Sequence, residues 1–193
     1  MNKNNPAKFY STKTYGTDRG LSCCFRQWKA THSHCSLLHG YSIGIKLIFE
    51  SNSLDSRNWV MDFGGLKTFQ RWAEYMFDHT LLIADNDPHL ETFQKLASIY
   101  DLNNETLKQV DEAGNLAQLK PHERRAICDL RIVPAVGCEM FAKMAYDKMS
   151  SLLTEMQDPA KTTARYPVNC DVRLKSVEVF EHGANSAIYE GAN

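Results

Sequence analysis

The sequence predicts an α+β fold in which the strands pair antiparallel. Segments that alternate apolar and polar residues gather toward both ends of the chain, and segments with helical spacing lie between them. A regular alternation of strand and helix, which would indicate a parallel sheet, is missing from this order. The 193 residues suit a single domain, 1–193, with a sizeable hydrophobic core.

A period of two predicts the strands. The clearest runs from Leu38 to Glu50, where His39 and Tyr41 fall on the same face as Ile43 and the apolar residues after it. The predicted strands cover residues 21–28, 38–50, 59–63, 126–133, 169–180 and 185–190, with a further short strand at 8–14.

Helical spacing of apolar residues predicts three helices, at 65–77, 89–100 and 137–153. The second has a start signal, because Asp87 is suited to capping a helix and Pro88 to its first position. Residues 102–125 are polar and charged, and we expect them to form an exposed insertion.

Composition favours a cytoplasmic protein with reduced thiols. The formal charge of −1 argues against nucleic acid or an anionic membrane as the main partner. The first residues lack the apolar core of a secretory signal, and we expect no membrane span. Of the six cysteines, none forms a CxxC pair, and Cys128, Cys138 and Cys170 fall in apolar patterns that predict core positions.

The densest chemistry lies between Thr31 and Ser42. His32, His34, Cys35 and His39 occur within nine residues, directly before the clearest strand. Imidazole and thiolate groups bind zinc and related metals, and they transfer protons near neutral pH. The segment therefore predicts an active site, although a polar turn that holds histidines gives the same pattern.

Six motifs in chain order resemble those of the 6-pyruvoyl-tetrahydropterin synthases and the related 6-carboxy-5,6,7,8-tetrahydropterin synthases. The Cys-x3-His-Gly-His motif is matched by Cys35–Tyr41, and the Leu-Asp-His motif by Phe77–His79. The remaining matches are Leu21–Gln27, Trp59–Lys67, Pro134–Glu139 and Val179–Gly191.

The resemblance implies the tunnelling fold, a four-stranded antiparallel sheet with helices on one face, assembled into homo-oligomeric barrels such as hexamers. It implies a lyase that acts on 7,8-dihydroneopterin triphosphate, with no membrane and no direct nucleic-acid partner. We expect the 6-carboxytetrahydropterin synthase reaction, which releases triphosphate and acetaldehyde for 7-deazaguanine (queuosine-type) biosynthesis. The alternatives are 6-pyruvoyl-tetrahydropterin synthase activity, a metal-free pterin aldolase, and a non-catalytic pterin or purine binder.

The resemblance also implies the roles of the site residues. Cys35 is the expected catalytic base, and Asp78 with His79 the expected proton relay. Glu181 is expected to bind the guanidine-like edge of the pterin, and Glu139 to contact it. Ordinary structural roles compete with these. A helix C-terminus suits His79, a helix first turn suits Glu139, and a strand end suits Glu181.

The zinc site departs from the family pattern. The family uses three histidines, and the matching positions here are Phe25, His39 and Tyr41, so only His39 is retained. Either His32 and His34 replace the missing ligands, giving a zinc site of His32, His34 and His39, or the metal has been lost.

Overall fold

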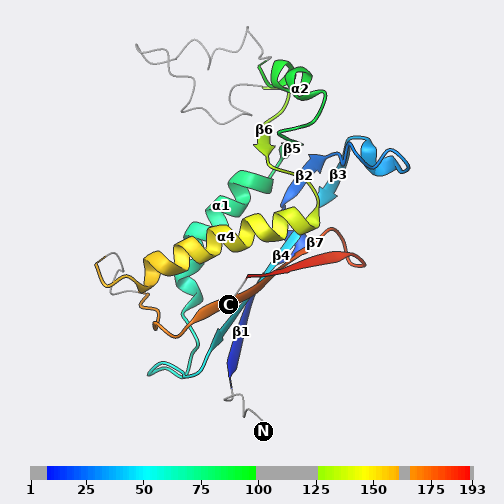
Figure 1. Ribbon diagram of the computed structural model, residues 1–193. Coiled ribbons are helices and arrows are strands. Elements are labelled where there is room, and N and C mark those ends of the chain that lie inside the picture. Colours follow the sequence, from blue (N-terminus) through cyan, green and yellow to red (C-terminus); the bar gives the residue numbers. More distant parts are fainter. Residues whose placement is uncertain (1–7, 99–125, 161–165, 192–193) are drawn as a thin grey trace, which may run out of the picture. The chain divides into compact units, whose positions relative to one another are not determined.

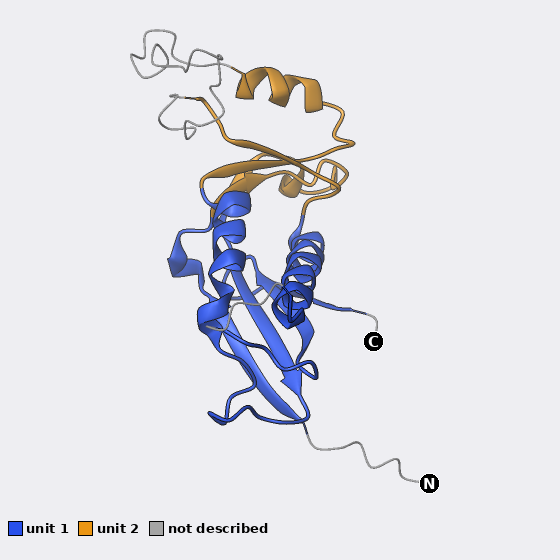
Figure 2. Ribbon diagram, turned by 90° about the vertical axis from the view of Figure 1, so that its left-hand side faces the viewer, with its two compact units in different colours: residues 1–21, 41–78, 137–193 blue, residues 22–40, 79–136 orange. Residues whose placement is uncertain are grey.

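A computed structural model describes residues 8–98, 126–160 and 166–191 (Figure 1). The chain divides into two compact units, each built from separate segments (Figure 2). Unit 1 comprises residues 1–21, 41–78 and 137–193, and unit 2 comprises residues 22–40 and 79–136. The expected insertion at 102–125 lies outside the described residues, and the single domain over 1–193 stays a prediction.

Unit 1 contains a four-stranded antiparallel sheet in the order β1-β4-β7-β8. Two α-helices and a preceding 3-10 helix, η3, accompany it. The bounds of these elements are Phe9–Tyr15 (β1), Gly44–Ser51 (β4), Phe63–Leu66 (η3), Lys67–Phe77 (α1), Cys138–Gln157 (α4), Arg173–Phe180 (β7) and Ser186–Glu190 (β8).

Both helices pack on the same face of this sheet. Tyr15 of β1 packs against Phe69 of α1, with ring centroids 5.8 Å apart. Tyr189 of β8 packs against Tyr146 of α4 at 5.2 Å. The strand register places Tyr15 and Tyr189 on one face, because Tyr15 pairs with Ile45, Ile45 with Val179 and Val177 with Tyr189. This arrangement confirms the α+β fold with helices on one side of an antiparallel sheet.

Period-two and helical patterns account for this core. Ile45, Leu47 and Phe49 alternate along β4, and each is fully buried. Phe77 of α1 and Phe141 of α4 meet edge to face, with ring centroids 5.2 Å apart. The other fully buried side chains of the two helices are Phe69, Ala73, Ala142, Ala145 and Met149.

A second four-stranded sheet, which the sequence patterns did not predict, lies mainly in unit 2. Its order is β3-β2-β5-β6, and the β2–β5 and β5–β6 pairs are parallel. Helix α2 contributes Phe93 to a small core with Leu81 and Ile83 of β5. The bounds are Ser22–Phe25 (β2), His39–Ser42 (β3), Thr80–Ala84 (β5), Leu90–Ala97 (α2) and Leu130–Val133 (β6).

The long strand predicted from Leu38 to Glu50 is two strands in different sheets. The break falls at Ile43, whose N–H donates to the carbonyl of Leu21 (3.0 Å). Gly44 follows, and a Cβ there would lie 3.2 Å from the carbonyl oxygen of Tyr15, so the backbones approach closely. His39 and Tyr41 therefore do not share a sheet face with Ile45, contrary to the prediction.

The strand predicted at 59–63 is also wrong. Asp55 Oδ1 accepts the N–H of Trp59 (2.9 Å), and Asp55 N–H donates to the carbonyl of Trp59 (2.8 Å), which closes a turn. Asp62 then caps η3 through Gly64 N–H (2.8 Å). These carboxylate contacts satisfy the backbone without strand pairing, and Trp59 is 47% exposed.

The three predicted helices are present with shifted ends. The first is η3 followed by α1, the second is the shorter α2, and the third extends to Gln157. Among the described residues, no helix is both long enough and apolar enough to cross a membrane.

Candidate active site

Cys35 lies in the connection between β2 and β3, within unit 2. A short 3-10 helix, His34–Ser36, carries it. Ser33 Oγ accepts the N–H of Cys35 (3.2 Å), and the carbonyl of Cys35 accepts the N–H of Gln27 (2.8 Å). The thiol is reduced and half-buried. Hydrogen bonds on both sides of the residue thus fix the backbone that carries the expected base.

A buried ion pair holds the start of this connection. Arg26 follows β2, and its Nε lies 3.1 Å from Oδ2 of Asp87, whose side chain is fully buried. Asp87 Oδ1 accepts the N–H of His89 (2.9 Å) at the start of α2. Nearby, the indole N–H of Trp28 donates to Asn86 Oδ1 (3.1 Å). These contacts tie the segment before Cys35 to the turn between β5 and α2.

The three expected zinc ligands do not form a metal site in the described geometry. His34 and His39 are neighbours, with ring centroids 6.3 Å apart, and His39 lies 6.4 Å from Phe25 by the same measure. His39 Nδ1 is 2.7 Å from the carbonyl oxygen of Leu37. His32 is exposed. Within the described ranges, no group of three or more His, Cys, Asp or Glu side chains could hold a metal ion.

Asp78 and His79 lie at the end of α1, both exposed. Asp78 is the C-cap, and its N–H donates to the carbonyl of Glu74 (2.9 Å). His79 has a φ of 55°, in the left-handed region that non-glycine residues seldom adopt, and its N–H donates to the carbonyl of Ser22 (2.7 Å). The pair therefore ends the helix, and a strained backbone fixes the position of the imidazole-bearing residue.

Glu139 and Glu181 both act on the electrostatics of Cys138 at the N-terminus of α4. Gly137 precedes the helix with a φ of 119°, which only glycine adopts readily. Burial first, and then the charges of Glu181 and Glu139, raise the pKa of the next residue, Cys138, to about 12. Both carboxylates therefore act electrostatically on one thiol, although they belong to distant parts of the sequence.

The two carboxylates differ in their surroundings. Glu139 is exposed in the first turn of α4, where its charge complements the helix dipole. Glu181 directly follows β7, and its side chain is 23% exposed. Asn185 Nδ2 donates to Glu181 Oε2 (3.4 Å), and the Glu181 N–H donates to the carbonyl of Asn185 (3.0 Å). The turn between β7 and β8 thus orients Glu181.

The expected site residues are divided between the two units. Unit 2 holds Cys35, His79 and the three histidines expected to bind zinc, and unit 1 holds Asp78 and the two glutamates. Sequence reasoning missed the Arg26–Asp87 pair, because a helix-start aspartate carries no sign of a distant ionic partner. It placed Cys138 in the core but did not connect it with the glutamates, and it wrongly placed Cys170, which is exposed.

Comparison with solved structures finds the same fold over nearly the whole chain. An uncharacterised protein from Wolinella succinogenes is 18% identical with a TM-score of 0.61, covering 96% of this chain and 98% of that one. A Plasmodium vivax 6-pyruvoyltetrahydropterin synthase with an alanine in place of a catalytic glutamate is 14% identical, with a TM-score of 0.54 and coverages of 95% and 97%. The Plasmodium falciparum 6-pyruvoyl tetrahydropterin synthase is 12% identical, with a TM-score of 0.53 and coverages of 95% and 98%.

The sequence itself carries the family assignment. No curated protein matches the chain in a sequence search. The profile described as 6-pyruvoyl tetrahydropterin synthase, however, matches residues 17–192, which include every motif discussed above. The chain therefore belongs to the 6-pyruvoyl tetrahydropterin synthase family and is a lyase of that family.

Proposed function

We propose that this lyase converts 7,8-dihydroneopterin triphosphate by the 6-carboxy-5,6,7,8-tetrahydropterin synthase reaction, with release of triphosphate and acetaldehyde. The product would serve 7-deazaguanine (queuosine-type) biosynthesis. The observation that carries the proposal is Glu181, a carboxylate only 23% exposed at the end of β7 that the β7–β8 turn orients through Asn185.

A carboxylate suits the pterin ring. Its guanidine-like edge presents adjacent N–H donors, and a carboxylate accepts two such hydrogen bonds at once. Of the two glutamates, Glu181 is the partly buried one, so it is the better placed to give a strong, water-excluded contact. In this proposal Glu181 anchors the ring, and the exposed Glu139 adds negative charge near it.

Cys35 is the proposed base for the carbon-bound proton. Its backbone is fixed by Ser33 and Gln27, and its half-buried thiol is reduced. Cys138 is unsuited to this role, because burial and two carboxylates keep it protonated at neutral pH. The Plasmodium vivax enzyme named above carries a catalytic glutamate, whose alanine and cysteine variants have been solved.

Asp78 and His79 are the proposed proton relay. Imidazole is a common general acid and base in enzymes, and Asp78 is its direct neighbour in the sequence. His79 keeps a strained backbone conformation although glycine would relieve it, which supports a role for the side chain.

The three-histidine zinc site does not fit the described geometry, so no step is assigned to zinc. When bound, zinc would acidify the hydroxyl groups of the substrate side chain. Two of the three positions that match the family's zinc ligands, Phe25 and His39, are neighbours, with ring centroids 6.4 Å apart.

We also propose a cytoplasmic homo-oligomer of the family type, such as a hexamer. Strands β1 and β8 are the edges of the unit 1 sheet, and they expose Tyr10 and Ile188, which are 51% and 63% exposed. Apolar edge strands of this kind favour pairing with another copy. Light scattering with size-exclusion chromatography measures the oligomer directly.

The other functions make different predictions for one assay. The chain is incubated with 7,8-dihydroneopterin triphosphate, and acetaldehyde and pterin products are measured. The proposed reaction gives acetaldehyde in equal amount to triphosphate, whereas 6-pyruvoyl-tetrahydropterin synthase activity gives triphosphate without acetaldehyde. An aldolase acts on dihydroneopterin lacking the triphosphate, and a non-catalytic binder gives no product. The reduced thiol in a fixed loop argues against the last alternative, because a binder needs no base.

A further inference from the structure

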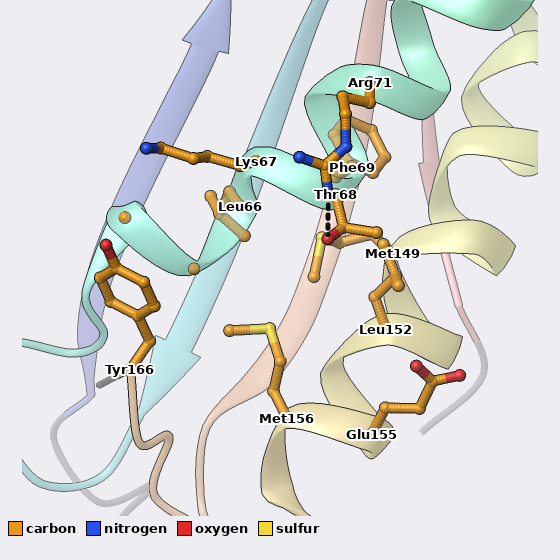
Figure 3. A pocket seen from close by; sticks show the side chains of 12 residues that line it. Leu66, Lys67, Thr68, Phe69, Arg71, Met149, Leu152, Glu155, Met156 and Tyr166 are labelled. Carbon is orange, nitrogen blue, oxygen red and sulfur yellow. Dashed lines mark hydrogen bonds between the residues drawn. The ribbon is translucent and has the colours of Figure 1, made fainter. Parts of the chain in front are cut away.

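A cavity of about 360 Å³ lies between α1 and α4 in unit 1, and it is built by other residues than those of the proposed pterin site. One wall is η3 with the first turn of α1, and the other is the C-terminal half of α4 (Figure 3). Its volume falls within the range of roughly 300–1,000 Å³ typical of small-molecule sites. None of the expected site residues lines it.

The interior is apolar and rich in sulfur and aromatic groups. Leu66, Met149, Leu152 and Met156 line it, and the ring of Tyr166 closes one end (Figure 3). Thioethers are polarizable and adapt to the shape of a ligand, and they pack well against aromatic rings. A flat aromatic body is therefore the shape that this lining suits.

Two glycines keep the hollow and its closing ring in place. A Cβ at Gly64 would lie 2.4 Å from Cε1 of Tyr166, and a Cβ at Gly65 would lie 2.6 Å from Cε of Met156. The backbone of η3 thus touches both side chains directly, so larger residues at these positions would push them from their places.

The rim carries opposite charges at opposite ends. Arg71 lies at one end, where its Nη2 donates to Thr68 Oγ1 (3.2 Å), and Glu155 lies at the other (Figure 3). The Lys67 side chain extends away from Arg71 and Thr68 in the same view. Because the hydroxyl orients the guanidinium, an anionic group has a preferred position beside Arg71 and is repelled at the Glu155 end.

We propose that this cavity binds a planar aromatic monoanion, with the ring between Met156 and Tyr166 and the anionic group on Arg71. The site is independent of the proposed pterin chemistry, so either can fail alone. Its volume and lining favour a flat aromatic body, and the charge of Arg71 favours an anion over a neutral molecule or a cation.

Methionine methyl resonances of the full chain test the proposal. The protein is labelled with ¹³C-methyl methionine, Met149 and Met156 are assigned by substitution with leucine, and 1-naphthalenesulfonate is titrated. Both methyl signals are expected to shift saturably. The methyl signal of Met61, which lines a different hollow, is expected to keep its chemical shift. The proposed site would be wrong if the Met61 signal shifted saturably instead, or if the signals of Met149 and Met156 did not shift at millimolar 1-naphthalenesulfonate.

Charge variants test the orientation. Arg71→Gln is expected to weaken sulfonate binding about fivefold to tenfold and to leave neutral 1-naphthalenemethanol binding unchanged. Glu155→Gln is expected to tighten sulfonate binding about twofold. Arg173→Gln removes the same charge from an exposed position outside the cavity and serves as the matched control. Equal weakening by Arg71→Gln and Arg173→Gln would contradict the proposal, because it would indicate non-specific attraction.

Discussion

The buried ion pair between Arg26 and Asp87 allows a quantitative test of how the Cys35 loop is held. Asp87→Ala removes a carboxylate whose side chain is fully buried and whose Oδ2 lies 3.1 Å from Arg26 Nε. It also removes the acceptor of the His89 N–H. Arg26 then remains largely buried without its partner, since only 19% of its side chain is exposed.

The expected cost follows from these two losses. Leaving one charge of a buried pair without its partner costs about 3–5 kcal/mol, and the partial exposure of Arg26 favours the lower end, about 3 kcal/mol. The lost hydrogen bond to the His89 N–H adds about 1 kcal/mol. The total of about 4 kcal/mol corresponds to a fall in Tm of about 8–16 °C for a chain of this size.

Urea unfolding of the full chain, with hydrogen exchange of β5 and α2, measures this effect. Asp87→Asn retains an acceptor for the His89 N–H, so we expect it to lose about 1 kcal/mol less than Asp87→Ala. A paired Arg26→Met and Asp87→Leu replacement leaves no unpaired charge, and it should be more stable than Asp87→Ala alone. A cost below about 1 kcal/mol for Asp87→Ala, the value of an exposed pair, would refute the reasoning.

Three further predictions follow from other parts of the molecule. Burial first, and then the charges of Glu181 and Glu139, raise the pKa of Cys138 from its ordinary 9.0 to about 12, so the unfolded chain loses this thiol proton before the folded chain does. The stability that the protonated Cys138 contributes is therefore complete below pH 9 and is lost as the pH rises toward 12. Denaturation at pH 8 and at pH 10.5 should show a lower free energy of unfolding at the higher pH. Equal free energies of unfolding would contradict this prediction. Asparagine tolerates the left-handed backbone, so the His79→Asn variant should keep its stability and lose its activity. The His79→Ala variant should lose its activity and also about 1 kcal/mol of unfolding free energy. Full activity of the asparagine variant would show that His79 is not part of the proton relay. Zinc analysis of purified protein tests the predicted zinc ligands. If His32, His34 and His39 bind zinc together, His32→Ala should lower the zinc content as much as His39→Ala does. The described geometry predicts instead that His32→Ala leaves the zinc content unchanged.

Local patterns predicted the antiparallel sheet of unit 1 and the three helices, because each has a periodic apolar face. Ile45, Leu47 and Phe49 alternate into the core, and Phe77 and Phe141 lie at helical positions that meet. The second sheet escaped prediction for a physical reason. Strands β2, β5 and β6 are short, and they pair parallel between segments distant in sequence, so no hairpin turn indicates the pairing.

The errors around the site have similar causes. The alternation from Leu38 to Glu50 is continuous in sequence, but a backbone hydrogen bond from Ile43 to Leu21 breaks it. The run from Trp59 to Phe63 is apolar, but carboxylates at Asp55 and Asp62 satisfy its backbone and favour a turn. Side-chain contacts between distant residues decide such cases, and single-sequence patterns do not record them.

The candidate site was found in part because its residues are chemically distinctive. Cysteine, histidine and the Asp78–His79 pair are visible as residue types in matched motifs, and the structure leaves their roles as predictions. The joint effect of Glu139 and Glu181 on the Cys138 thiol was not predicted, because the two carboxylates lie far apart in sequence.

Product analysis with matched variants tests the central claim most directly. The chain, Cys35→Ser and Glu181→Gln are each incubated with 7,8-dihydroneopterin triphosphate, and acetaldehyde and triphosphate are measured together. The proposal predicts equal amounts of both products from the unaltered chain. Cys35→Ser should lose most of the turnover with little change in KM, and Glu181→Gln should raise KM about tenfold or more through loss of a charge-assisted contact. Triphosphate release without acetaldehyde would contradict the 6-carboxytetrahydropterin synthase reaction, and unchanged turnover in Cys35→Ser would contradict the role of the loop thiol.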